Sequence, residues 1–232
     1  MSLSEHTIPV ALSARHVHLS QAHVEALFGP GHKLTPSSEL SQPGQFAARE
    51  TVELVGPKRS IPGIRVLGPA RPATQAELSF TDGVVLGINL PFRLSGDIGG
   101  SPGAHLIGSR GAVKLAEGLI VASRHVHCSP DDARRLGLAD RQKIYVRVPG
   151  PRGLVFDEVV VRVDPQFRTE LHLDTDEGNA AGIRPGSVVE VLASLCRDAC
   201  GAEACPIAPG VEQGATQPYC GYTRRSVSFY RG

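Results

Sequence analysis

Eight stretches of the chain have the apolar and polar pattern of short β-strands, because they either alternate with a period of two or stay apolar over the length of a strand. They cover residues 7–13, 50–56, 63–68, 83–90, 119–127, 143–150, 154–163 and 187–193. The chain also contains 26 Gly and 18 Pro, which break or bound most of these stretches. Gly and Pro interrupt regular elements, so the sequence predicts a mainly β fold of short strands and tight turns.

Only two stretches look helical. They cover residues 20–29 and 129–138, and both begin with a serine, which is a favoured N-cap residue. The second continues with a proline and two aspartates, which suit the first turn of a helix. Each stretch follows one copy of the tetrapeptide RHVH, at residues 15–18 and 124–127. The sequence therefore repeats a unit made of a strand, a His-x-His pair and a short capped helix.

Further blocks repeat in the same order. Residues 52–59 resemble residues 146–153, and residues 77–88 align without a gap with residues 172–183. The two His-x-His pairs are 109 residues apart, whereas the later blocks are 95 residues apart. The difference predicts an internal duplication with an insertion in the first copy. The turn-rich stretch over about residues 29–49 has no clear counterpart, so we expect it to be the insertion.

Length and composition limit the class of protein. A chain of 232 residues is long enough for two modest domains with real cores. With 41% hydrophobic residues, 20% charged residues and a net charge of +1, it has no electrostatic reason to bind nucleic acid. No apolar run is long enough to span a membrane, and the first residues do not resemble a signal peptide, so we expect a cytoplasmic location.

Each half offers a His-x-His pair and a third residue that can bind a metal ion. Residues i and i+2 of a strand point to the same face, so both imidazoles of a pair can converge on one ion. The alignment of the later blocks places a glutamate of the first half opposite a histidine of the second. The two sets are His16, His18 and Glu77, and His125, His127 and His172. His₂Glu and His₃ are ligand sets of catalytic zinc with an open fourth position, although cobalt, nickel or iron also suit them.

A single His-x-His pair is equally typical of two histidines on a polar strand face, but two copies in matched context favour metal binding. A purely structural metal, or a polar seam between two barrels, is the alternative. Strand alternation directs Cys128 away from the face of His127, which argues against a cysteine nucleophile. The same alternation argues against contact of Arg15 or Arg124 with a metal-bound substrate.

Two other features of the sequence, an arginine and a glycine-rich loop, could bind an anion. Arg71 lies six residues before Glu77, and a guanidinium offers planar, bidentate donors to phosphate. The alternative is a solvated surface arginine. The loop over residues 89–103 is rich in glycine and hydroxyl side chains, so backbone amides there can approach an anion. It lacks the P-loop pattern, and an ordinary structural turn fits its composition equally well.

Five motifs together resemble the phosphate propanoyltransferase family, phosphotransacylases associated with bacterial microcompartments. They are ARHVHLS, GPARPATQAELS, FRLSGDIGGSPG, IVASRHVHCSP and HLDTDEGNAAGI, in this order between about residues 8 and 192. The resemblance implies a transferase that exchanges a short acyl group between coenzyme A and inorganic phosphate. The chemistry needs no protein nucleophile, and the sequence shows no Ser-His-Asp or Cys-His arrangement, so we expect direct attack of phosphate on the thioester.

The resemblance also implies a fold and a site. The fold is two β-barrels with short helical caps and two zinc ions at their junction, held by the two ligand sets above. Arg71 would bind phosphate, and Ser95 and Ala122 would contact coenzyme A. Because barrels of this family exchange their first strand, we expect one barrel over residues 15–122 and the other over residues 5–14 and 123–192.

The chain departs from the family pattern at both ends. Family members usually begin with an amphipathic encapsulation segment, and the few residues before the first His pair predict none, although a microcompartment lumen remains an alternative location. The extension over residues 193–232 contains Cys196, Cys200, Cys205 and Cys220 in a spacing that matches no standard zinc or cluster motif. Its glycine-rich and proline-rich composition and its basic, aromatic end favour contact with a protein partner or a microcompartment component over a third metal site.

Three classes of function follow, headed by the zinc-dependent acyltransferase. A dinuclear zinc hydrolase would use the same ligands, but it usually needs bridging carboxylates and a general base, for which Glu77 and Asp97 are the candidates. A non-catalytic, metal-stabilised scaffold module is the third class. The sequence fixes neither the acyl chain nor whether the chain forms a homo-oligomer.

Overall fold

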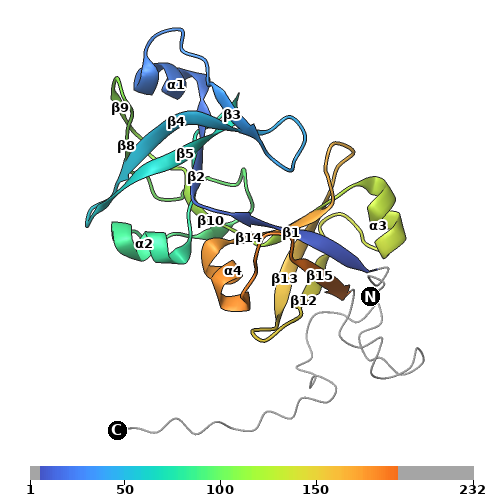
Figure 1. Ribbon diagram of the computed structural model, residues 1–232. Coiled ribbons are helices and arrows are strands. Elements are labelled where there is room, and N and C mark those ends of the chain that lie inside the picture. Colours follow the sequence, from blue (N-terminus) through green and yellow to red (C-terminus); the bar gives the residue numbers. More distant parts are fainter. Residues whose placement is uncertain (1–5, 193–232) are drawn as a thin grey trace, which may run out of the picture. The chain divides into compact units, whose positions relative to one another are not determined.

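The computed structural model describes residues 6–192 of the chain. The predicted extension over residues 193–232, with its four cysteines, lies outside the described residues. The described residues form a mainly β structure with four short helices, in agreement with the predicted fold class (Figure 1).

Six strands form a closed barrel. In hydrogen-bonding order they are β1 (Thr7–Ser13), β14 (Glu170–Asp174), β11 (His125–Cys128), β13 (Leu154–Val163), β12 (Lys143–Val148) and β15 (Val188–Leu192). β1 closes the barrel, because it pairs in parallel with β14 and antiparallel with β15. Val126, Val161 and Leu171 are among the fully buried side chains of its core. Among the described residues, the first strand, β1, therefore belongs to the same barrel as the last strand, β15.

Nine strands form a second sheet, which is open. Its main path runs β7 (Phe92–Arg93), β10 (Leu119–Ala122), β6 (Gln75–Glu77), β2 (His16–Ser20), β5 (Ser60–Arg71), β4 (Phe46–Val55), β8 (His105–Ile107) and β9 (Ala112–Lys114). The ninth strand, β3 (Pro36–Glu39), pairs with β4. A second hydrophobic core, with Leu54, Val66 and Leu119 fully buried, packs against this sheet.

The prediction of two closed barrels is therefore wrong for the first half. In the barrel, β12 pairs with β15, and β15 pairs with β1 to complete the ring. In the open sheet, the edge of β4 pairs instead with β8, which belongs to the β8–β9 hairpin. β10 pairs with β7, which has only two residues. The ladder ends there, and a barrel needs a continuous ladder to close.

The structure confirms both predicted helices. α1 (Gln21–Phe28) begins after Ser20 and α3 (Pro130–Leu136) after Ser129, and each serine side chain accepts a hydrogen bond from a backbone amide of the first turn. Those amides would otherwise lack a partner.

The prediction of only two helices, and of a strand over residues 83–90, is wrong. α2 (Phe80–Leu86) occupies part of that stretch, and α4 (Thr175–Ala181) lies at the matching place in the second half. Ser79 and Asp82 form a capping box at the start of α2, and Asp174 and Glu177 form one at the start of α4. Each helix ends at a glycine in the left-handed conformation, so local capping outweighs the strand-like apolar pattern.

The chain crosses between the barrel and the open sheet next to each His-x-His pair. β1 lies in the barrel and β2 in the sheet, with residues 14–15 between them. β10 lies in the sheet and β11 in the barrel, with residues 123–124 between them. The single strand predicted over residues 119–127 is therefore two strands in different sheets. Because both crossings precede a histidine pair directly, they bring the two pairs to the junction of barrel and sheet.

The expected insertion, about residues 29–49, contains β3 and a turn from Leu40 to Gln45 that reaches the barrel. The Gln42 side chain is buried and hydrogen-bonds with the backbone of Arg168 in both directions, at 2.9 and 3.2 Å.

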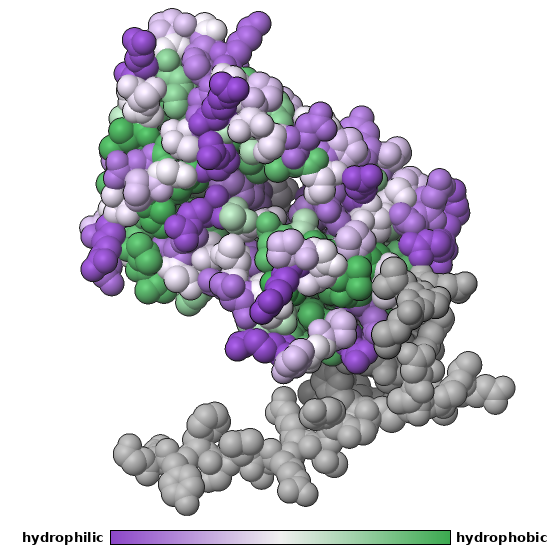
Figure 2. All heavy atoms as spheres, viewed as in Figure 1, coloured by the Kyte–Doolittle hydropathy of each residue, from purple (hydrophilic) through white to green (hydrophobic). Residues whose placement is uncertain are grey.

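The visible face of the molecule is mostly hydrophilic, with hydrophobic residues between the polar ones (Figure 2). None of the described helices is long and apolar enough to cross a membrane.

Candidate metal centre

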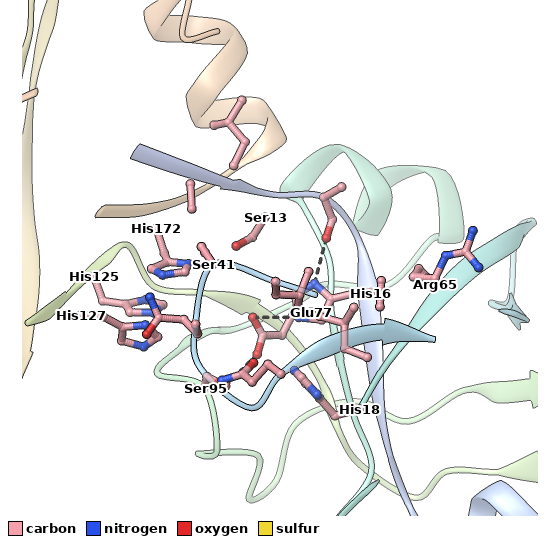
Figure 3. A pocket seen from close by; sticks show the side chains of 18 of the residues that line it. Ser13, His16, His18, Ser41, Arg65, Glu77, Ser95, His125, His127 and His172 are labelled. Carbon is pink, nitrogen blue, oxygen red and sulfur yellow. Dashed lines mark hydrogen bonds and ion pairs between the residues drawn. The ribbon is translucent and has the colours of Figure 1, made fainter. Parts of the chain in front are cut away.

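A cavity of about 470 Å³ lies at the junction of barrel and sheet, and all six candidate metal ligands line it. Figure 3 shows His125, His127 and His172 together on one side, and His16 and Glu77 beside each other on the other. The turn that carries Ser41 also lines the cavity, so the insertion forms part of its wall.

The first set comes from two neighbouring strands of the open sheet. His16 and His18 lie on β2, and Glu77 lies directly opposite His16 on the antiparallel strand β6. The Nε2 atom of His16 is 3.5 Å from Oε2 of Glu77. One ligand atom from each of the three residues lies within 4.8 Å of the others, so all three can turn toward one ion.

The second set repeats this arrangement in the barrel. His125 and His127 lie on β11, and His172 lies directly opposite His125 on the antiparallel strand β14. The three rings have centroids 4.4 to 5.0 Å apart, and their ligand atoms again lie within 4.8 Å of one another. The alignment of Glu77 with His172 in the sequence thus corresponds to equal positions in the two ladders.

Backbone carbonyls orient the first histidine of each pair. Nδ1 of His16 is 2.8 Å from the carbonyl oxygen of Ala14, and Nδ1 of His125 is 2.8 Å from that of Ser123. A carbonyl only accepts, so Nδ1 carries the proton in both rings. The lone pair of Nε2 is then free to bind a metal ion, and a hydrogen bond on the other nitrogen fixes the ring as metal-binding histidines require.

Burial keeps the imidazoles of His18, His125 and His127 neutral. It lowers the pKa of His18 to about 3, of His125 to about 4 and of His127 to about 2, with neighbouring histidines adding to the effect. Burial opposes the charge of Glu77, but the facing histidines and a hydrogen bond from Ser95 outweigh it and hold the pKa of Glu77 at about 2. Metal binding requires neutral imidazole and ionised carboxylate, and both forms prevail at neutral pH.

Three buried nitrogens have no hydrogen-bond partner among the described residues: Nδ1 of His18, Nδ1 of His127 and Nε2 of His172. A buried polar atom without a partner costs about 1–3 kcal/mol, so the Nδ1 atoms of His18 and His127 point to a ligand, whereas Nε2 of His172 lies 3.1 Å from Oε1 of Glu170. They belong to both candidate sets, whose other members are neutral imidazole and carboxylate. The residues of this structure therefore fit two divalent ions of the zinc type.

The three remaining predicted site residues differ in where they lie. Arg71 and Ser95 both line the cavity, and Nη1 of Arg71 is 3.4 Å from Oγ of Ser95. The Ser95 hydroxyl donates to Oε1 of Glu77 at 2.7 Å, so it supports a candidate metal ligand. Ala122 ends β10 opposite Arg93 and is not among the described residues that line the cavity.

The arginine of each RHVH copy binds an acid of a helix cap. Arg15 is 3.0 Å from the buried carboxylate of Asp82 at the start of α2, and Arg124 is 2.8 Å from Glu177 at the start of α4. This explains why arginine recurs next to both histidine pairs. Cys128 is fully buried in the barrel core, on the face opposite the cavity, as strand alternation predicts.

Sequence reasoning missed Arg65 and Arg162, which line the cavity together with Arg15 and Arg71. Arg162 lies opposite His127 in β13, at the position that Leu67 occupies opposite His18 in β5. Its guanidinium is 5.6 Å from the centroid of Phe167, whose ring stacks on His127 at 4.0 Å. The 95-residue alignment pairs Leu67 with Arg162, and the change from apolar to cationic was the available signal.

Comparison with known proteins gives a consistent result. A family model described as phosphate propanoyltransferase matches residues 9–184. The chain is 48% identical over 185 residues to the phosphate propanoyltransferase of Listeria monocytogenes, covering 80% of this chain and 87% of that protein. It is 49% identical over 186 residues to that of Thermotoga maritima, covering 80% and 89%. It is 51% identical over 180 residues to that of Priestia megaterium, covering 78% and 83%.

Proposed function

Because the chain belongs to the phosphate propanoyltransferase family, we propose that it moves a short acyl group, propanoyl in the first instance, between coenzyme A and inorganic phosphate with two zinc ions. One observation carries the proposal: both three-ligand sets and Arg71 line one cavity. His16, His18 and Glu77 would hold one ion, and His125, His127 and His172 the other. The matched registers of the two sets also support an internal duplication, with the sites at the junction of its copies.

Two arginines supply the phosphate site. Arg71 lies on the sheet side and Arg162 on the barrel side of the cavity, and each is partly buried, which lowers its pKa while leaving it charged. A phosphate dianion between them would exchange its hydration for guanidinium donors. In a partly enclosed cavity such pairing is stronger than in water, so it both binds the anion and orients one of its oxygens.

Transfer then needs no acyl-enzyme. A phosphate oxygen attacks the thioester carbonyl carbon, the carbon–sulfur bond breaks, and coenzyme A leaves as a thiolate that takes a proton from solvent. Zinc at the two sets supplies Lewis-acid stabilisation of the developing oxyanion and affinity for the departing sulfur. In the described part of the chain, the cysteine is buried in the barrel core, and the Ser95 hydroxyl donates to Glu77, which the proposal makes a metal ligand.

The test is release of coenzyme A from acetyl-CoA and propanoyl-CoA, with and without phosphate, on protein of measured zinc content. We expect release only with phosphate, and loss of at least about 100-fold in His125→Ala. Arg71→Ala and Arg162→Ala should raise the phosphate concentration needed for half-maximal rate. The matched control is Arg147→Ala, which removes an exposed arginine that pairs with Glu190 on the barrel surface.

Each alternative class gives a different result in this assay. A zinc hydrolase would release coenzyme A without phosphate, and a scaffold module would release none. An acyl-enzyme trapped from acyl-CoA alone would overturn direct transfer.

A further inference from the structure

Gln75 and Glu170 occupy the same position in the two ladders. Each lies two residues before the third ligand of its set, Glu77 or His172, and therefore on the same face of its strand. Each also pairs, across the antiparallel ladder, with the second histidine of its His-x-His pair. Both side chains are buried, with 3% exposure for Gln75 and 5% for Glu170.

The two residues differ in the chemistry that their neighbours require. Nε2 of Gln75 donates to Oε1 of Glu77 at 2.6 Å, so an amide donor faces a carboxylate ligand. Oε1 of Glu170 lies 3.1 Å from Nε2 of His172, so a carboxylate acceptor faces an imidazole ligand. This second contact has the distance of a hydrogen bond but not yet its direction, since His172 Nε2 has no such bond among the described residues. If Nε2 of His172 donates to Glu170, Nδ1 is left for a metal ion.

Other residues at these two positions would lose the match between support and ligand. A glutamate at position 75 would put a second buried carboxylate against Glu77, and like charges at that distance repel strongly. An apolar residue at position 170 would leave the free nitrogen of His172 without an acceptor. The third ligand and its supporting residue therefore differ together between the halves, as expected if each support is selected by its ligand.

A loop from outside the strand fixes each supporting side chain. Ser41 and Gln42, in the insertion, both donate to Oε1 of Glu170 at 2.5 Å. On the sheet side, the backbone amide of Gly96 donates to Oε1 of Gln75 at 2.8 Å. The insertion of the first half thus holds a carboxylate of the barrel in place.

We propose that Gln75 and Glu170 are positioning residues, each matched to the third ligand of its own metal site, and that the insertion sets the orientation of Glu170. The inference rests on the proposed function, because it takes the two metal sites as real. Loss of a residue that orients a metal ligand typically weakens metal binding by about 10–100-fold. The effect should be confined to one site in each case.

The experiment measures zinc affinity of the full-length chain by competition with a chromogenic chelator. His16→Ala leaves only the barrel site and His125→Ala only the sheet site, so each background reports one ion. We expect Glu170→Ala to weaken zinc by about 10–100-fold in the His16→Ala background and to leave the His125→Ala background unchanged. Gln75→Ala should give the reverse pattern. Glu170→Gln keeps an acceptor oxygen at the same place, so it should restore part of the affinity.

The outcomes separate the inference from the function on which it rests. Failure of the unmodified chain to take up zinc would refute the metal sites, and the positioning role with them. Two tight sites in the unmodified chain, with unchanged affinity in Glu170→Ala and Gln75→Ala, would overturn the positioning role alone. Equal weakening of both sites by one substitution would also overturn it, because a general structural effect does not select a site. Thermal unfolding of each metal-free variant verifies that it is folded.

Discussion

Mild acid should destabilise the metal-free protein, because three buried histidines resist protonation. Burial lowers the pKa of His18, His125 and His127 to about 3, 4 and 2, whereas in the unfolded chain it is about 6.5. Below pH 6.5 the unfolded chain therefore binds protons that the folded chain does not. Their contribution to stability is complete above pH 6.5 and is lost progressively as the pH falls toward these folded values.

The size of the effect follows from the number of protons. Between pH 7.5 and pH 5.5, each such histidine lowers the free energy of unfolding by about 1.4 kcal/mol, so the three together lower it by about 4 kcal/mol. A typical domain is stable by only about 5–15 kcal/mol, so this is a large fraction of the total. Glu77 and Glu170, whose pKa values lie near 2, do not interfere, because an acid with a lowered pKa loses its contribution only below about pH 4.5.

Urea unfolding at pH 7.5 and at pH 5.5, with chelator present throughout, measures this difference. The matched variant His127→Asn keeps a polar side chain but removes one titrating group. The loss of unfolding free energy between the two pH values should therefore be about two thirds of that of the unmodified chain. Equal free energies of unfolding at the two pH values, with an unchanged dependence on urea, would refute the reasoning. So would an unchanged loss in His127→Asn.

Three further substitutions test the fold. Leu54→Ala removes a fully buried side chain of the sheet core and should cost about 2–5 kcal/mol in urea unfolding, whereas Ile107→Ala on the neighbouring strand, 42% exposed, should cost clearly less. Ser79→Ala removes the cap of α2 and should lower the free energy of unfolding by about 1 kcal/mol in the same assay. An unchanged free energy of unfolding would show that the capping box does not stabilise the fold. Gly103→Ala would place a methyl group 2.0 Å from the carbonyl oxygen of Leu115, so little folded protein should be recovered by gel filtration.

The sequence was sufficient to predict which residues the structure brings together in the two candidate sets, because a repeat compares the chain with itself. Matching His-x-His pairs and the alignment of Glu77 with His172 needed no three-dimensional information. Strand alternation likewise predicted that Cys128 would point away from the face of His127. These predictions depend on residues that are close in the sequence or on a simple register.

The parts that failed depend on long-range pairing or on competing local signals. Whether the sheet of the first half closes depends on which strand pairs with the free edge of β4. The alternation of residues within one strand does not say which strand will pair there. The crossing within residues 119–127 interrupts an unbroken apolar run, so periodicity alone joined two strands. α2 and α4 were within reach, because Ser79 and Asp82 already have the spacing of a capping box before a glycine.

The differences between the halves give the cavity two unlike sides. Arg71 lies on the sheet side and Arg162 on the barrel side, among four arginines that line the cavity, and each side has one buried carboxylate, Glu77 in the lining or Glu170 behind it. On the sheet side the carboxylate is itself a candidate ligand, whereas on the barrel side it lies behind His172. A divalent ion held by three neutral nitrogens keeps more of its positive charge than one bound by a carboxylate.

In the proposed reaction, the barrel side is therefore the better place for the negative charge of the oxyanion or the departing thiolate. Phosphate would lie between Arg71 and Arg162 before attack. On this argument the change from glutamate to histidine, with the matched change from Gln75 to Glu170, would give the two proposed metal sites different charges and different roles. Exchange of the pair Gln75 and Glu77 for glutamate and histidine should then give a chain that still binds two zinc ions but needs less phosphate for the same rate, because the ion on the sheet side is no longer bound by a carboxylate. An unchanged phosphate requirement in that double variant would show that the two sides are equivalent.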